Sequence, residues 1–144
     1  MEQAEKNGPL SVARMVENQS MHFVIVEDDA YLRSLLTQRL SREGFLVVEA
    51  ENGKAGLKAI RECAPHIVLL DIILPDMDGY EVLEEMQKDK TLSGIPVIVL
   101  SNLGQKEEVD RAKALGAKWF LIKAKYTPDE IVAYVKKVLS EAYI

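Results

Sequence analysis

Five short, largely apolar runs separated by helical patterns constrain the fold of this chain more than any other feature. The runs lie at residues 22–26, 45–50, 67–70, 96–100 and 118–122. Short runs rich in Val, Ile and Leu are typical of strands buried on both faces, and their alternation with helices is typical of a parallel sheet. We therefore predict an α/β fold of three layers, in which helices cover both faces of a doubly wound, five-stranded parallel sheet with right-handed crossovers.

The segments between these runs carry their own helix signals. Helices are predicted over residues 30–43, 54–63, 80–88 and 105–115, and from residue 128 onward. Gly44 and Gly116 are placed to end two of these helices, because glycine readily adopts the left-handed conformation that follows a helix. Thr127 and Glu130 have the spacing of a capping box, which favours a helix start just after Thr127.

The length of the chain fits one domain with one hydrophobic core, since 144 residues leave no room for a second domain with a core of its own. Residues 1–20 contain the breaker pair Gly8 and Pro9 and show no strong periodicity. We predict a flexible arm, a linker or a tag there. Residues 21–144 then form the folded domain, and no output domain is expected after the last helix.

The composition narrows the classes of function. Acidic residues exceed basic ones by 23 to 18, and the net charge of −5 argues against nucleic-acid binding as the main task. The single cysteine, Cys63, excludes an intramolecular disulfide and fits a reducing compartment. No apolar run approaches the roughly 18–20 residues that span a bilayer, and no secretion signal is visible. We therefore expect a cytoplasmic protein without a membrane partner.

Polar residues follow four of the predicted strands at the point where each strand ends. Glu27 and Asp28 follow the first strand, Asp71 the third, Ser101 the fourth and Lys123 the fifth. The carboxyl ends of parallel strands meet at one edge of a sheet, so these side chains should lie together. Clustered carboxylates repel one another unless a cation intervenes, and oxygen ligands suit Mg²⁺. Asp71 is then a candidate phosphoryl acceptor, with Lys123 and Ser101 contacting the transferred group.

Each of these residues also has a structural interpretation when it is taken alone. An acid after a strand often caps the next helix, which is what we expect of Asp29. A serine at a strand end is usually a turn residue, and a lysine is usually a solvated charge. The convergence of all of them on one edge favours a functional site.

The motifs that carry these residues resemble the receiver domain of two-component response regulators, the CheY-like family. They are VIVEDD at 24–29, IVLLDIILPDMDG at 67–79, PVIVLS at 96–101, ALGA at 114–117 and FLIK at 120–123. The similarity runs from about residue 21 to about residue 139. It implies a flavodoxin-like sheet with the strand order 2-1-3-4-5.

The resemblance also implies a role for each site residue. Asp71 is expected to be the phosphoacceptor, Ser101 the switch hydroxyl, Phe120 the switch aromatic and Lys123 the phosphoryl contact. Mg²⁺, or Mn²⁺ in its place, is expected to be held by Glu27, Asp28, Asp71 and the backbone carbonyl of Ile73.

The family further implies a phosphorylation-dependent switch and not an enzyme, with only self-catalysed phosphotransfer and slow autodephosphorylation. The donor would be a sensor histidine kinase or a histidine phosphotransfer protein. Phosphorylation would remodel the face formed by the fourth helix, fifth strand and fifth helix for a protein target or for a second copy. A phosphohydrolase using the same edge of the sheet, and a pseudo-receiver with a structural role, are the alternatives.

Several positions depart from the family pattern. Ala124 follows Lys123 in place of the usual proline, so we expect either a trans peptide bond or a strained cis bond there. Asn102 stands where a small residue is usual and is expected to narrow access to the phosphoryl group. Ile73 and Leu103 are apolar and cannot orient a water molecule by a hydrogen bond, which predicts a long-lived phosphoaspartate.

Overall fold

One parallel sheet organises residues 21–143, the part of the chain that the computed structural model describes. Its five strands lie in the order β2-β1-β3-β4-β5, and all neighbouring strands are parallel. The strands are β1 (His22–Val26), β2 (Leu46–Ala50), β3 (Ile67–Leu70), β4 (Val97–Ser101) and β5 (Trp119–Ile122). The predicted α/β class and the strand order implied by the family are both confirmed. The flexible arm predicted for residues 1–20 lies outside the described residues.

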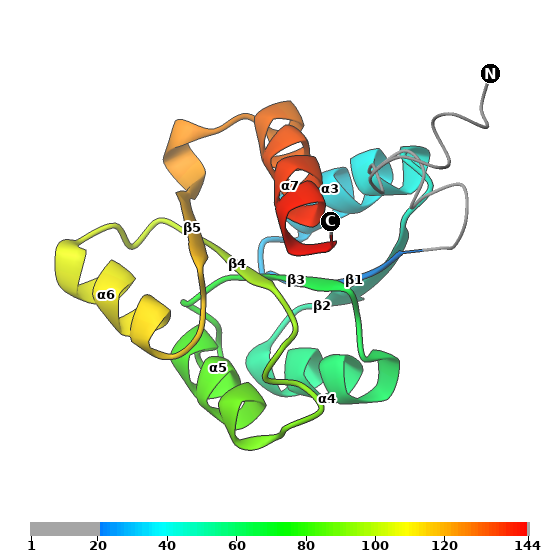
Figure 1. The fold of residues 1–144 in the computed structure, drawn as a ribbon. Helices are drawn as coiled ribbons and strands as arrows, with labels where there is room; N and C mark the ends of the chain where they lie inside the picture. The colour runs from blue at the N-terminus through cyan, green and yellow to red at the C-terminus, as the bar shows by residue number, and fades with distance from the viewer. Residues whose placement is uncertain (1–20, 144) are drawn as a thin grey trace.

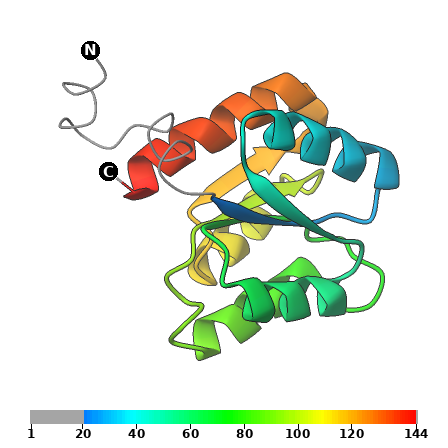
Figure 2. The same ribbon diagram turned by 90° about the vertical axis from the view of Figure 1, so that its right-hand side faces the viewer.

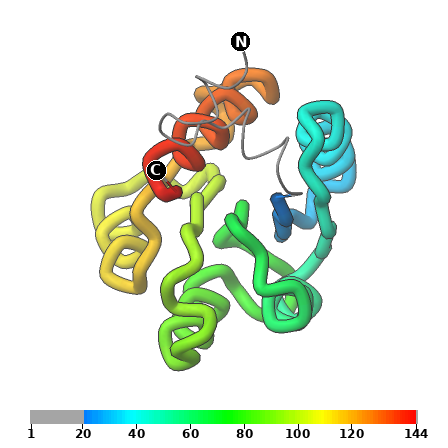
Figure 3. Tube along the Cα trace, turned by 45° about the vertical axis from the view of Figure 1, so that its right-hand side comes forward, coloured from blue at the N-terminus to red at the C-terminus, as the bar shows by residue number. Residues whose placement is uncertain are grey.

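Helices cover both faces of this sheet, which confirms the three-layer prediction. They are α3 (Ala30–Arg42), α4 (Gly53–Cys63), α5 (Gly79–Lys88), α6 (Lys106–Ala114) and α7 (Pro128–Tyr143). Helices α3 and α7 pack on one face, and α4, α5 and α6 on the other (Figures 1 and 2). The tube in Figure 3 shows the same layers, with α7 and α3 above the strands and α4 and α5 below them. Within residues 21–143, no helix is long and apolar enough to cross a membrane.

The apolar runs form strands because successive side chains of a strand point to opposite faces, and here both faces are covered. In β1, Phe23 and Ile25 pack in the core beneath α3 and α7, while Val24 and Val26 pack in the core beneath α4, α5 and α6. Strands β3 and β4 alternate in the same way. Burial on both faces explains why these strands show no polar alternation in the sequence.

The predicted helix signals are present in the structure. Thr127 Oγ1 accepts a hydrogen bond from the Glu130 N–H at 3.1 Å, and Glu130 Oε1 accepts one from the Thr127 N–H at 2.8 Å. Gly44 and Gly116 have φ angles of 94° and 104°, which a residue with a side chain rarely adopts. The Asp29 carboxylate caps α3 by accepting from the Tyr31 and Leu32 amides. These local signals therefore fix where the helices begin and end.

The segment after β5 differs from the family pattern and was not predicted as a helix. Residues Lys123–Lys125 form a single 3₁₀ turn, η1, which the Tyr126 N–H closes by donating to the Lys123 carbonyl at 3.3 Å. None of the peptide bonds among the described residues is cis, so the bond between Lys123 and Ala124 is trans. The absence of proline at 124 thus leaves an amide N–H free to donate a hydrogen bond.

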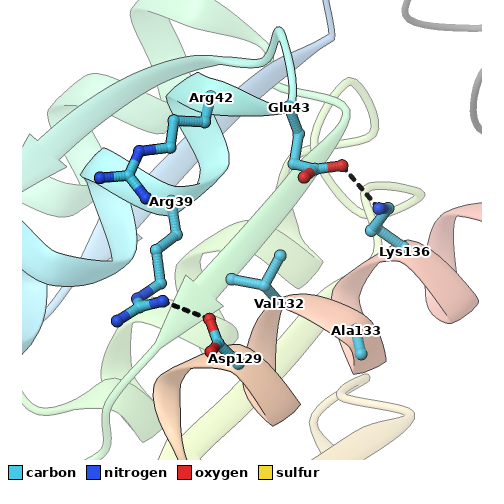
Figure 4. A pocket seen from close by; sticks show the side chains of 7 residues that line it. All are labelled: Arg39, Arg42, Glu43, Asp129, Val132, Ala133 and Lys136. Atoms are coloured by element: carbon cyan, nitrogen blue, oxygen red, sulfur yellow. Dashed lines mark hydrogen bonds and ion pairs between the residues drawn. The ribbon is translucent and has the colours of Figure 1, made fainter.

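Two ion pairs join α3 to α7 at the surface. Arg39 pairs with Asp129, and Lys136 lies 2.5 Å from Glu43, on either side of Val132 (Figure 4). Exposed pairs of this kind contribute about 0–1 kcal/mol each. The packing of the two helices therefore depends mainly on the apolar side chains that they bury against the sheet.

A histidine pair lies at the amino ends of the strands, where β1 and β3 begin. The His22 N–H donates a hydrogen bond to His66 Nδ1 at 2.9 Å, and the two rings meet edge to face with their centroids 5.7 Å apart. The Tyr143 hydroxyl of α7 donates to the His66 carbonyl. Burial, and to a smaller degree the neighbouring His22, lowers the pKa of His66. The bond to Nδ1 requires that this nitrogen be unprotonated.

We predict that protonation of His66 destabilises the fold. Because the pKa of His66 is lower in the folded chain than its usual value of 6.5, the unfolded chain binds the proton more readily. The stability contributed by neutral His66 should be fully present above pH 6.5 and should be lost as the pH falls below that value. Urea unfolding at pH 7.5 and pH 5.5 should show a larger loss of unfolding free energy for wild type than for His66→Gln. An equal loss in both proteins would contradict this prediction.

Candidate functional site

The carboxyl ends of the central strands place the predicted site residues at one edge of the sheet. Glu27 follows β1, Asp71 follows β3 and Ser101 is the last residue of β4. Lys123 follows β5 as the first residue of η1. Since all of these strands are parallel, their carboxyl ends point the same way, and the side chains converge at the carboxyl ends of β1, β3 and β4.

Three carboxylates form a cluster at this edge. One carboxylate oxygen from each of Glu27, Asp28 and Asp71 lies within 4.8 Å of the other two. Glu27 and Asp71 are buried, whereas Asp28 is exposed. The cluster thus has a dry interior side and an open side at Asp28.

The Lys123 ammonium group lies between the two buried carboxylates. Its Nζ is 2.6 Å from Asp71 Oδ2 and 2.6 Å from Glu27 Oε1. Burial alone would lower the pKa of Lys123, but the hydrogen bonds and charges of Asp71 and Glu27 outweigh it and raise the pKa. Lys123 is therefore a permanent cation at neutral pH, held against the acidic cluster.

The main chain holds Asp71 in place. Asp71 Oδ1 accepts hydrogen bonds from the Ile72 N–H at 2.7 Å and the Ile73 N–H at 3.3 Å. Its other oxygen, Oδ2, faces Lys123. Each oxygen of this carboxylate therefore has a separate set of donors, which fixes the plane of the group.

Glu27 is the second buried acid of the cluster. Its Oε2 accepts from the Asp29 N–H at 3.0 Å, and its Oε1 lies 2.6 Å from Lys123 Nζ. Burial, together with the charge of Asp71, raises the pKa of Glu27 in spite of the opposing effect of Lys123. Removal of an anion from water is costly, so the buried Glu27 carboxylate favours positive charge nearby.

The residues present fit a hard divalent cation. Three carboxylates and one ammonium group leave a formal charge of −2 when all four are ionised. The donor atoms are oxygens, and the exposed Asp28 leaves room for water ligands, both of which Mg²⁺ prefers. Glu27, Asp28 and Asp71 could therefore hold a magnesium ion.

Comparison with known proteins identifies the family. The model of the response regulator receiver domain matches residues 23–136. The chain belongs to the response-regulator receiver domain family.

Individual relatives of this receiver domain agree. It is 36% identical over 129 residues to a probable transcriptional regulator, ycf27, of Pyropia yezoensis, covering 88% of this chain and 51% of the relative. It is 31% identical to the phosphate regulon transcriptional regulatory protein PhoB of Escherichia coli, covering 81% of this chain and 50% of the relative. The chain thus spans about half the length of these curated relatives. A CheY-like receiver domain structure from Methanospirillum hungatei superimposes with a TM-score of 0.79 at 28% identity, covering 86% of this chain and 97% of that one.

The residues expected to act as the switch lie beside the acidic cluster or one strand away. Ser101 is fully buried, and its Oγ lies 3.4 Å from the donating N–H of Leu103. Phe120 is half-buried and packs on the α4–α6 side of the sheet. Its neighbour Trp119 packs on the other side, against the core of α3 and α7. The side chain of Ile73 is 57% exposed beside Asp71.

The loop between β3 and α5 contains two acids with structural roles that the sequence analysis did not assign. Asp76 Oδ1 accepts from the Gly53 N–H at 2.8 Å, and Asp76 Oδ2 accepts from the Lys54 N–H at 3.3 Å, so Asp76 caps α4 from a distant loop. Asp78 caps α5 in a capping box with Glu81. These bonds hold the loop that follows Asp71 against two helix starts.

Glycine is required next to this loop. A Cβ atom at Gly79 would lie 2.4 Å from the Asp71 carbonyl oxygen, and one at Gly53 would lie 1.9 Å from the Met77 carbonyl oxygen. Both distances are far below contact, so a side chain at either position would push the loop away from the site. The spacing of Asp78 and Glu81 is a capping-box signal, whereas no local pattern indicates the contact of Asp76 with α4.

Two further contacts hold the main chain near the site. Glu49, the one acid of β2, pairs with Arg33 Nε at 2.9 Å. Arg33 also donates to the Glu27 carbonyl at 2.6 Å and so steadies the end of β1. Asn102 Oδ1 accepts from the Ala124 N–H at 3.0 Å, which joins the loops after β4 and β5.

We predict that Lys123→Met destabilises the protein in the absence of divalent cations. The substitution leaves Glu27 and Asp71 buried and unpaired, and removal of one partner of a buried pair costs about 3–5 kcal/mol. Because protonation of Glu27 relieves part of this repulsion, we expect a loss near the lower end of that range at pH 7.5.

Urea unfolding with and without Mg²⁺ tests this expectation, with Lys125→Met in the exposed part of η1 as the control. Magnesium should raise the unfolding free energy of Lys123→Met by more than that of wild type, since the ion takes over the neutralising role. Equal stabilisation of the two proteins would contradict this exchange of roles between the ion and Lys123.

Proposed function

We propose that this receiver domain accepts a phosphoryl group on Asp71 and acts as a phosphorylation-dependent switch, with no other enzymatic activity. One observation carries the proposal: Lys123 Nζ lies 2.6 Å from an oxygen of Asp71, in a cluster with two further carboxylates. A surface carboxylate would not need such a partner. A carboxylate that receives an anionic group does, because negative charge accumulates on it.

The donor in this proposal is a phosphohistidine of a sensor histidine kinase or of a histidine phosphotransfer protein. An oxygen of Asp71 attacks phosphorus, an O–P bond forms, and the P–N bond of the donor breaks. The electron pair of that bond remains on the imidazole nitrogen. Lys123 stabilises the charge that spreads over the phosphoryl oxygens during transfer, and Ser101 donates a hydrogen bond to one of them.

Magnesium, or manganese, would be held by Glu27, Asp28, Asp71 and the backbone carbonyl of Ile73. When bound, the ion supplies positive charge that offsets the repulsion between the phosphoryl group and the carboxylates. The protein's own part is to hold the Asp71 carboxylate in a fixed plane, which the amides of Ile72 and Ile73 do through Oδ1.

The output of the switch is proposed to be the face formed by α6, β5 and α7. Helix α6 buries only Ala112 of its nine residues, which leaves it the most loosely anchored helix of that face. A shift of Ser101 toward the phosphoryl group, with a reorientation of Phe120, would move α6 relative to β5. We propose that this change favours binding of a protein target or of a second copy, in the cytoplasm and without direct contact of this chain with nucleic acid.

We predict Mg²⁺-dependent labelling with one phosphoryl group per chain. Incubation with radiolabelled acetyl phosphate should label wild type with Mg²⁺ and not with EDTA. Asp71→Asn should remain unlabelled because the amide cannot act as the acceptor, and the matched variant Asp110→Asn on α6 should label like wild type. Labelling that survives both EDTA and Asp71→Asn would overturn the proposal, and multiple rapid turnovers would favour a phosphohydrolase.

The same experiment measures how long the phosphoryl group remains. Neither Ile73 nor Leu103 carries a side chain that can orient water by a hydrogen bond. Ile73→Asn restores such a group, and a transition-state hydrogen bond of about 1 kcal/mol corresponds to a roughly fivefold faster loss of label. Loss from wild type within seconds, with no acceleration in Ile73→Asn, would contradict slow autodephosphorylation.

A further inference from the structure

The loops that carry Ser101 and Lys123 are joined by a hydrogen bond outside the acidic cluster. Asn102 directly follows Ser101, and Ala124 directly follows Lys123. Asn102 Oδ1 accepts from the Ala124 N–H at 3.0 Å. The bond therefore links the residue after Lys123 to the residue after Ser101.

A second contact brings the same two loops together. A Cβ atom at Gly104 would lie 2.6 Å from Ile122 Cδ1, so the loop after β4 rests directly on the last residue of β5. On its other side, η1 is closed by the hydrogen bond from the Tyr126 N–H to the Lys123 carbonyl. Beyond the end of β5, the main chain at Lys123 is thus held by its own short turn and by the neighbouring loop.

The position of Lys123 matters because its ammonium group serves two carboxylates at once. Nζ is 2.6 Å from both Asp71 Oδ2 and Glu27 Oε1, so a small shift of the main chain would lengthen at least one contact. The single turn of η1 contributes only one closing hydrogen bond among its described contacts. The bond to Asn102 is therefore a substantial part of what keeps this turn in place.

We propose that Asn102 is a positioning residue for phosphoryl transfer, acting through Ala124 to hold Lys123 against Asp71. This inference rests on the proposed function for its catalytic consequence, but not for its structural one. The chain takes this route because residue 124 is not proline and offers an N–H. Because of this bond, a displacement of the loop that carries Ser101 would also displace Lys123.

The proposal is tested with Asn102→Ala, which removes the acceptor, and Asn102→Asp, which keeps an oxygen acceptor at the same reach. Lys125→Ala, an exposed residue of η1, is the control. With acetyl phosphate at saturating Mg²⁺, the maximal labelling rate should fall about fivefold in Asn102→Ala, the effect of losing one ordinary hydrogen bond. Asn102→Asp keeps the acceptor but adds a negative charge, so it should label faster than Asn102→Ala and no faster than wild type. Lys125→Ala should label within about twofold of wild type. The Mg²⁺ dissociation constant should stay unchanged in Asn102→Ala, since the carboxylates are intact.

A double-mutant cycle decides whether Asn102 acts through Lys123. Urea unfolding without divalent cations compares Asn102→Ala in wild type and in Lys123→Met. A smaller loss of stability in the Lys123→Met background supports the proposal, because no lysine is left to position. Equal losses in both backgrounds, or a wild-type labelling rate in Asn102→Ala, would overturn it.

The labelling assay and the unfolding cycle test the proposed function and this inference separately. If wild type is not labelled on Asp71, the proposed function fails. The unfolding cycle still tests the coupling between Asn102 and Lys123 in that case.

Discussion

Lys123 places one ammonium group 2.6 Å from each of two buried carboxylates, Asp71 and Glu27. Without that cation, two anions would share a site from which most water is excluded, and one of them would take up a proton. With Lys123 in place, both carboxylates can remain ionised before a metal ion or a phosphoryl group binds. The exposed Asp28 then adds a third carboxylate and leaves the cluster short of positive charge.

The rest of the domain serves to keep these groups together. Parallel strands bring their carboxyl ends to one edge, and burial on both faces makes those strands rigid. Asp76 and Asp78 tie the loop after Asp71 to the starts of α4 and α5, and Gly79 lets that loop approach the Asp71 carbonyl. The loop is therefore part of the site although none of these three residues belongs to the acidic cluster.

Much of this arrangement could be predicted from the sequence, because it is encoded in local patterns. Apolar runs predict strands, and a parallel sheet then requires that Glu27, Asp71, Ser101 and Lys123 gather at one edge. The capping box of Thr127 and Glu130 is likewise a short-range signal, and the structure confirms it.

Contacts between loops that are distant in the chain could not be predicted from the sequence. The spacing of Asp76 does not indicate that it caps a helix more than twenty residues earlier in the chain. The bond between Asn102 and Ala124 depends on how two loops approach one another, which no local pattern indicates. Nor does a local pattern indicate that Glu49 of β2 pairs with Arg33 of α3.

Chemical mapping can locate the phosphoryl group on Asp71 itself. Borohydride reduction of the acetyl phosphate-treated protein converts an aspartyl phosphate to homoserine, and peptide mass spectrometry locates the changed residue. We predict conversion at position 71 alone, and only in protein treated in the presence of Mg²⁺. Conversion at Asp28 or at an exposed acid such as Asp110, with Asp71 unchanged, would show that Asp71 is not the acceptor.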